Sequence, residues 1–184
     1  MTDPQKQILL DDQSVRRMLA RMAREVVEQV GRVESLALIG IHRRGVDLAQ
    51  WLAREIKRDE GVVIPTGSLD ITLYRDDLMA IGPRPIVGET RLPKEGIEGL
   101  TVVIVDDVLF TGRTVRAALD ELTDFGRPKR ILLCVLVDRG GRELPIHADI
   151  VGRIYTVDDK DRVEVMVPEV DGELGVSLVK GAIE

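Results

Sequence analysis

The chain has 184 residues, 44% of them hydrophobic and 32% charged, which is enough for one sizeable core and excludes a disordered chain. Its net charge of −6 excludes a uniformly basic nucleic-acid binder but not a local basic patch. No apolar run approaches the ~20 residues of a membrane span, and residues 1–7 lack the pattern of a signal peptide. We therefore expect a cytoplasmic protein without a membrane partner. The single cysteine, Cys134, excludes an internal disulfide and a cysteine-based zinc site, and its apolar surroundings predict a buried side chain.

The first expected element is a helix over about residues 13–30, capped by Asp12 or Ser14 and ended by Gly31. Its apolar residues recur at spacings of three and four, as one face of an amphipathic helix requires: Val15, Met18, Leu19, Met22, Val26 and Val30. A different face carries the arginines Arg17, Arg21 and Arg24. Taken alone, such a stripe is most simply a solvated face.

The chain then alternates between apolar runs typical of strands and periodic segments typical of helices. In order, we expect strand 35–41, helix 46–58, strand 62–64, strand 69–74, strand 100–105, helix 114–125 and strand 131–137. The helix over 114–125 should turn Val115, Ala118, Leu119, Leu122 and Phe125 inward. Near the C-terminus, Val163, Val165 and Val167 alternate as in a strand, and Asp171-Gly172 indicates a hairpin.

Strands that alternate with helices predict a parallel sheet covered on both faces. We expect one α/β domain over residues 1–184, with a small β-rich appendage at its C-terminal end. Residues 74–93 have no sustained periodicity and contain Gly82-Pro83-Arg84-Pro85, which predicts a long flexible loop or an open hairpin. Loops of this length inside compact domains are usually functional.

The strongest motif is the stretch 102–114, in which a buried strand ends in Asp106-Asp107 and Thr111-Gly112-Arg113-Thr114 opens a helix. Free N–H groups at a helix start, two hydroxyls and a glycine form a site for an anion. The two carboxylates suit sugar hydroxyls or a bridging cation rather than the phosphate itself. A ligand with a ribose and a monophosphate fits this arrangement. The alternative is a strand followed by a capped helix.

This stretch resembles the signature of type I phosphoribosyltransferases, which bind phosphoribosyl pyrophosphate (PRPP). The resemblance implies their fold, a central, mostly parallel sheet flanked by helices with a small β-rich hood and a flexible loop. It also implies that Asp106 and Asp107 hold the ribose hydroxyls, with Mg²⁺ accompanying PRPP. The loop that would cradle the 5′-phosphate comprises Val108, Leu109, Phe110, Thr111, Gly112, Arg113 and Thr114.

Phe110 departs from the general signature, because purine-salvaging members often have an aspartate there. An aromatic residue resembles one branch of the family, the bifunctional pyrimidine operon attenuators that are also uracil phosphoribosyltransferases. The resemblance implies the reaction of uracil with PRPP to give UMP and pyrophosphate, and binding of UMP or UTP. It also implies a homodimer or a higher homo-oligomer.

Three further strand ends contribute polar residues to the expected site. Gly40 to Gly45 places Arg43 and Arg44 where the family has its pyrophosphate loop, whereas His42 reads as a turn residue. The segment 69–77 resembles the start of the family's flexible loop, so that Arg75 would act with Asp106 and Asp107 in catalysis by neutralising the departing pyrophosphate. After the strand over 131–137, the resemblance places Val137, Asp138 and Arg139 at the base and nucleotide.

The attenuator branch also binds a stem-loop in the leader mRNA of the pyrimidine operon when a uridine nucleotide is bound. The resemblance implies that the RNA surface comprises Arg17, Arg21, Arg24, Arg142, His147 and Arg153. His147 stands where an arginine is common, and residues 152–157 depart from the family pattern. With five aromatic residues in the chain, recognition would depend on phosphates and hydrogen bonds rather than on base stacking.

Two alternatives stay open at the level of the residues. The first is a salvage phosphoribosyltransferase for uracil or another base, without a role in RNA binding. The second is a catalytically inactive protein that only senses nucleotides, against which the intact acidic pair and the two arginine-bearing loops argue.

Overall fold

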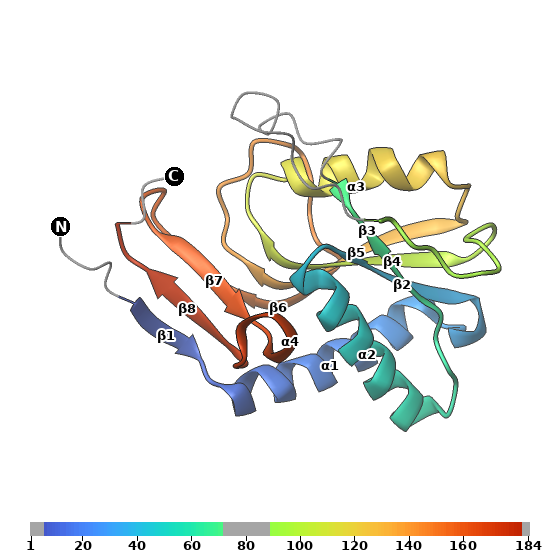
Figure 1. The fold of residues 1–184 in the computed structure, drawn as a ribbon, viewed down its shortest axis with the longest axis horizontal. Helices are drawn as coiled ribbons and strands as arrows, with labels where there is room; N and C mark the ends of the chain where they lie inside the picture. The colour runs from blue at the N-terminus through green and yellow to red at the C-terminus, as the bar shows by residue number, and fades with distance from the viewer. Residues whose placement is uncertain (1–5, 72–88, 182–184) are drawn as a thin grey trace.

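A five-stranded parallel sheet forms the centre of the molecule (Figure 1). The protein is described by a computed structural model, which covers residues 6–71 and 89–181. Across the sheet, the strands are β3 (Thr66–Leu69), β2 (Leu36–Ile41), β4 (Thr101–Leu109), β5 (Arg130–Asp138) and β6 (Ile150–Ile154). Every pair of neighbouring strands in this sheet is parallel, which confirms the α/β fold expected from the sequence.

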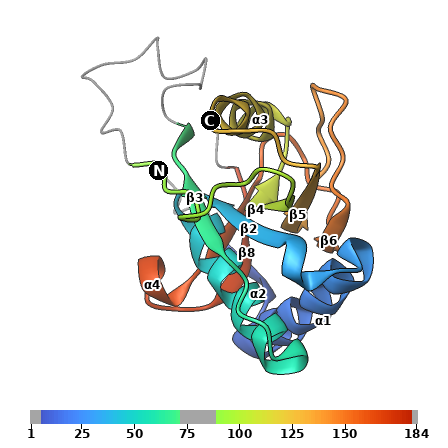
Figure 2. The ribbon, with the colours of Figure 1, turned by 90° about the vertical axis from the view of Figure 1, so that its right-hand side faces the viewer.

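Helices cover both faces of this sheet (Figures 1 and 2). Helices α1 (Asp12–Val30) and α2 (Arg44–Glu60) lie on one face, and α3 (Arg113–Asp124) lies on the other. A 3-10 turn, η1 (Val33–Ser35), connects α1 to β2. The side chain of Asp11, not that of Asp12 or Ser14, caps α1 by accepting the Ser14 N–H at 2.8 Å. Gly31 ends α1 in the left-handed conformation, as expected.

The appendage is an antiparallel three-stranded sheet beside the main one (Figure 1). Its strand order is β1 (Lys6–Leu10), β8 (Gly175–Val179) and β7 (Arg162–Met166). The chain between β7 and β8 contains a one-turn helix, α4 (Pro168–Asp171), and Gly172 ends it with φ 76°. The prediction of a tight hairpin turn at Asp171-Gly172 is therefore wrong, although β7 and β8 do pair with each other.

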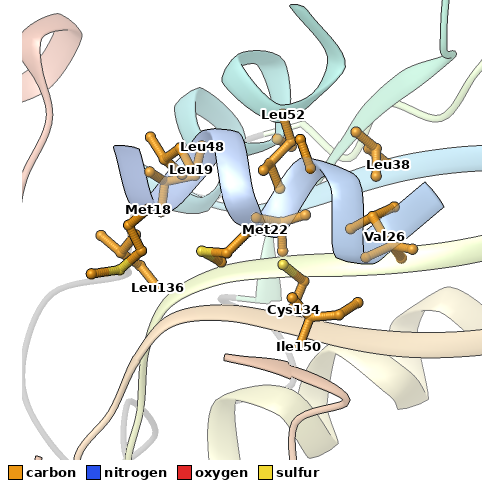
Figure 3. Close-up of a cluster of buried hydrophobic side chains, with 14 of the residues drawn as sticks. Met18, Leu19, Met22, Val26, Leu38, Leu48, Leu52, Cys134, Leu136 and Ile150 are labelled. Atoms are coloured by element: carbon orange, nitrogen blue, oxygen red, sulfur yellow. The ribbon is translucent and has the colours of Figure 1, made fainter. Parts of the chain in front are cut away.

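The larger of two hydrophobic clusters lies between α1, α2 and the sheet (Figure 3). Met22 and Val26 of α1 point toward Cys134 and Ile150 of the sheet. Cys134 is fully buried, and burial raises the pKa of its thiol far above the usual range, so it is an inert core residue as expected. The ring of Trp51 in α2 contacts two guanidinium groups, since its centroid is 4.7 Å from the Cζ atom of Arg16 and 5.4 Å from that of Arg54.

Several expected elements differ in the structure. Residues 62–64 are not a strand, and Val63 is 70% exposed. Of the strand expected over 69–74, only Leu69 lies in a strand, as the last residue of β3. Residues 72–74 lie outside the described part of the chain. Phe125 is not inward but 51% exposed, because α3 ends at Asp124. Strands β1 and β6 were not expected, since neither has a clear alternating pattern.

Within the described residues, no helix is both long enough and apolar enough to cross a membrane.

Candidate active site

Parallel strands place their carboxyl ends along one edge of the sheet, where ligands bind in open α/β folds. Here three neighbouring strands, β2, β4 and β5, end beside one another. The segments that follow them are residues 42–45, 110–114 and 139–147, which are three of the motifs singled out in the sequence. The fold therefore brings these motifs together.

The acidic pair lies within β4 rather than after it, because the strand continues to Leu109. Asp106 and Asp107 are neighbours near the carboxyl end of this strand, but they differ in exposure. Asp106 is buried, and its Oδ1 accepts the Asp107 N–H at 2.9 Å. Asp107 is half-buried, its Oδ1 accepts the Val108 N–H at 2.9 Å, and it lines a cavity of about 520 Å³.

The loop after β4 leads into α3 with the geometry of an anion site. Gly112 has φ 94°, a conformation that favours glycine, and α3 begins at Arg113. The Thr111 hydroxyl oxygen accepts the Arg113 N–H at 3.3 Å, and Thr114 is half-buried in the first helical turn. Arg113 is exposed and pairs with Glu143. The N–H groups of the first turn of a helix have no partner within the helix and favour a negatively charged ligand.

Two glycines bring the arginine-bearing loop against the acidic pair. A Cβ atom on Gly45 would lie 2.4 Å from the Val105 carbonyl oxygen and 3.3 Å from the Asp106 Cα. A Cβ atom on Gly40 would lie 2.4 Å from the Gly45 carbonyl oxygen. Only residues without a side chain permit this approach, which holds the loop 42–45 next to the end of β4.

The two arginines of this loop have different surroundings. Arg43 is exposed, and Arg44 forms a bidentate ion pair with Asp171 of α4, at 3.0 Å and 2.8 Å. The hydrogen bonds from Arg44 hold the pKa of the Asp171 carboxyl below its ordinary value. Arg44 and Asp171 both line the 520 Å³ cavity with Asp107. His42 is exposed at the start of the loop, as expected of a turn residue.

The segment after β5 packs on the loop that follows β4. Arg139 is 4% exposed, and its guanidinium stacks 3.9 Å above the centroid of the Phe110 ring. Within the described residues, the Arg139 Nε has no hydrogen-bond partner. Val137 is fully buried beside Val108, and the Asp138 side chain accepts the Gly140 N–H at 2.9 Å. Val137 is thus a core residue, whereas Phe110 and Arg139 form a stacked pair at the sheet edge.

Only part of the expected RNA surface comes together in the structure. Arg17, Arg21 and Arg153 line one hollow of about 320 Å³, and Arg21 also donates to the carbonyl oxygens of Val151 and Gly152. Arg24 lies further along α1, 3.4 Å from Asp59. His147 is exposed on the loop between β5 and β6. Arg142 is turned inward and bonds to the chain itself, so it is not part of the exposed group.

The structure adds residues that the sequence did not indicate. Lys6 of β1, together with Arg162 and Glu164 of β7, lines the cavity that contains Asp107 and Arg44. No local motif marks them, because their position follows from pairing between the two ends of the chain, which the sequence does not display. Arg75, in contrast, lies outside the described residues.

The acidic pair is suited to Mg²⁺ that arrives bound to a substrate, more than to a metal ion that the protein holds permanently. Within the described residues, no cluster of three or more metal-ligating side chains exists. Mg²⁺ commonly binds through one or two carboxylates and completes its shell with water and phosphate oxygens. Asp106 and Asp107 offer this donor set, and the half-buried Asp107 faces a cavity with room for a substrate.

The fold and this sheet edge define a phosphoribosyl transferase, and the comparisons with known proteins agree. Residues 5–169 match the family model of the phosphoribosyl transferase domain. A hypoxanthine phosphoribosyltransferase from Trypanosoma cruzi superposes with a TM-score of 0.70 at 22% identity, covering 96% of each chain. A hypoxanthine-guanine phosphoribosyltransferase from Bacillus anthracis superposes with a TM-score of 0.69 at 19% identity, covering 97% of this chain and 99% of the other. At these identities, the likeness shows the shared fold.

The sequence relatives are more specific. The bifunctional protein PyrR of Thermus aquaticus is 56% identical over 170 residues, covering 92% of this chain and 93% of its own. That of Pelotomaculum thermopropionicum is 49% identical over 178 residues, covering 97% and 98%. The chain belongs to the PyrR family of phosphoribosyl transferases. This membership confirms the function expected from the sequence, a transcriptional attenuator of the pyrimidine operon that is also a uracil phosphoribosyltransferase.

Proposed function

We propose that the edge formed by residues 42–45, 106–107 and 110–114 binds PRPP. Asp106 and Asp107 hold the ribose hydroxyls, the loop 110–114 holds the 5′-phosphate, and Arg43 and Arg44 hold the pyrophosphate. The observation that carries this proposal is the close approach of Gly45 to Val105 and Asp106, which sets the cationic loop beside the acidic pair. One elongated ligand with a ribose between two phosphate groups can span these three segments.

The proposed chemistry depends on placement and charge. As pyrophosphate leaves, positive charge develops at the anomeric carbon of the ribose, beside the carboxylates of Asp106 and Asp107. Negative charge grows on the leaving group, where Arg43, Arg44 and Arg75 neutralise it. Asp106 and Asp107 would hold Mg²⁺ that binds with PRPP, and the ion would stabilise negative charge on the leaving group. Phe110, Asp138 and Arg139 border the uracil and orient it toward the reacting carbon.

Replacing both carboxylates tests this site. We expect Asp106→Asn with Asp107→Asn to lower the turnover number by about a hundredfold or more, because charge stabilisation in the transition state is lost. The melting temperature should change little. The double variant Asp120→Asn with Asp124→Asn, on the exposed side of α3, makes the same chemical change away from the site and should keep wild-type turnover. Turnover by the first variant equal to that of the second would refute the assignment.

We further propose that the hollow lined by Arg17, Arg21 and Arg153 contacts the leader mRNA, with Arg24 and His147 at its margins. Three guanidinium groups from α1 and β6 converge there, although the two elements are distant in the sequence. Clustered arginines bind phosphate oxygens and confer a strong dependence of affinity on salt. A homodimer of this chain would place two such hollows on one assembly, which suits a folded RNA.

Titration with leader RNA tests the regulatory proposal. Affinity should rise when UMP is present and fall by about tenfold or more between 50 and 200 mM salt. Arg17→Ala should weaken binding and reduce the slope of log affinity against log salt by about one. Arg116→Ala, an exposed arginine of α3 on the opposite face of the sheet, is the matched control. No binding at low salt would instead indicate a salvage enzyme without an RNA role.

A further inference from the structure

Arg142 contacts the loop that follows β4 through its guanidinium group. Its guanidinium donates to the carbonyl oxygens of Phe110 at 2.6 Å, Ile146 at 3.0 Å and Gly140 at 3.2 Å. It also donates to the Leu109 carbonyl oxygen at 3.4 Å and forms an ion pair with Asp138. The side chain is 19% exposed, and these acceptors occupy most of the donors that an RNA contact would require.

Arg142 is the centre of a wider contact between the segment 138–146 and the loop 109–112. The Arg139 N–H donates to the Leu109 carbonyl oxygen at 3.1 Å. The N–H groups of Glu143 and Leu144 donate to the Thr111 carbonyl oxygen at 3.0 and 3.2 Å. Three successive carbonyl groups, those of residues 109, 110 and 111, are therefore held by one segment.

The orientation of these carbonyl groups fixes the orientation of the N–H groups that follow them. A trans peptide unit is planar, and its N–H points opposite to its C=O. Since the carbonyl groups of Phe110 and Thr111 point toward the segment 138–146, the N–H groups of Thr111 and Gly112 point away from it. Backbone N–H groups that point the same way in successive residues form a cradle for an anion.

We propose that Arg142 is a positioning residue for the phosphate loop: by holding the carbonyl groups of Leu109 and Phe110, it directs the loop N–H groups toward the 5′-phosphate of the substrate. This inference rests on the proposed PRPP site. Arginine is suited to the role because its five donors lie in one plane, and it keeps its charge at any physiological pH. Lysine has three donors on one nitrogen and lacks the additional donors by which Arg142 also binds Ile146 and Asp138.

Comparing UMP with uridine isolates the phosphate loop, because the two ligands differ only in the 5′-phosphate. Calorimetry would give the affinity of both for the wild type, Arg142→Ala, Arg142→Lys and, as a control, Arg58→Ala, an exposed and ion-paired arginine at the far end of α2. We expect the affinity of Arg142→Ala for UMP to be about tenfold lower than that of the wild type, because the hydrogen bonds from the loop N–H groups to the phosphate are misplaced. Its affinity for uridine should be unchanged. The KM for PRPP should rise by a similar factor while that for uracil stays constant. Arg142→Lys should lie between the alanine variant and the wild type.

The outcomes separate this inference from the assignment of the site. If the wild type binds UMP no more tightly than uridine, the phosphate loop itself is misassigned, and the role of Arg142 is overturned with it. If the wild type prefers UMP and Arg142→Ala retains that preference in full, the site stands and the inference is wrong. Equal losses for UMP and uridine would also overturn it, because they would show a general structural role. Should the alanine variant fail to fold, full UMP preference in Arg142→Lys decides against the proposal.

Discussion

At the scale of single residues, Glu121 is an acidic side chain on the buried face of α3. It is 4% exposed, and burial raises the pKa of its carboxyl, although the Thr90 hydroxyl donates to one oxygen. In the described part of the chain, its other oxygen has no hydrogen-bond partner. The Thr90 hydroxyl oxygen in turn accepts the Asp70 N–H at 3.0 Å. This chain of contacts ties α3 to residue 70, which precedes the expected flexible loop, and to residue 90, near the end of that loop.

We predict that Glu121→Gln raises the free energy of unfolding at pH 7 by about 1 kcal/mol, since a buried charge is removed while the Thr90 hydroxyl keeps an acceptor. The carboxyl pKa is higher in the folded chain than in the unfolded chain. Below about pH 4.5, the ordinary pKa, the carboxyl is protonated and does not destabilise the folded chain. As the pH rises through the pKa of the folded chain, the group ionises and the free energy of unfolding falls. Thermal melts from pH 4 to pH 8 should show the two proteins converging toward acid pH. Asp120→Asn, an exposed neighbour, serves as control; a variant less stable than the wild type at pH 8 would contradict the prediction.

At the scale of elements, the sequence was most informative where a pattern repeats. The apolar stripe predicted α1, because one face of this helix is buried. The continuous β-branched run predicted β4, because both faces of this central strand are buried. Strand β6 was missed since it forms the edge of the sheet, where Ile154 is 68% exposed and apolar residues do not alternate. Val62 to Ile64 has strand-forming residues but pairs with no strand among the residues that the structure describes. Propensity without a pairing partner does not make a strand.

The candidate site shows the same distinction. Its motif residues could be predicted because strand ends in an α/β sheet converge by topology. The inward position of Arg142 could not, because it depends on which carbonyl groups the loop after β4 leaves unpaired. Nothing in the sequence around Arg142 distinguishes a guanidinium that binds the chain from one that faces solvent.

At the scale of the whole molecule, the two sheets are linked by the ion pair of Arg44 with Asp171. Arg44 begins α2 on the main sheet, and Asp171 lies in the connection between two strands of the small sheet. The Asp171 carboxylate also accepts the Val167 N–H at 2.9 Å. The pair therefore adds a polar contact between the appendage and the main sheet beside the cavity that contains Asp107, in addition to the apolar packing of the two sheets.

We predict that Asp171→Asn lowers the free energy of unfolding at neutral pH by roughly 1 kcal/mol, a modest value because Arg44 is 37% exposed and water screens the pair. The Asp171 pKa is depressed in the folded chain, so its contribution is present above the ordinary value of 3.8 and is lost as the pH falls through the folded value. The melting temperatures of wild type and variant should thus differ at pH 7 and approach each other near pH 3. Glu173→Gln, which lines the same cavity, is the control. A difference that persists undiminished in acid would rule out the ion pair as its source.

The position of Trp51 gives the molecule a built-in optical reporter. It is the only tryptophan in the chain, and the guanidinium group of Arg16, on α1, lies over its ring from across the helix interface. Arg16 is the immediate neighbour of Arg17, so a movement of the proposed RNA-contacting end of α1 must change the surroundings of the indole. Excitation at wavelengths that tyrosine does not absorb would therefore read out this one interface, without any attached dye and without altering a single side chain.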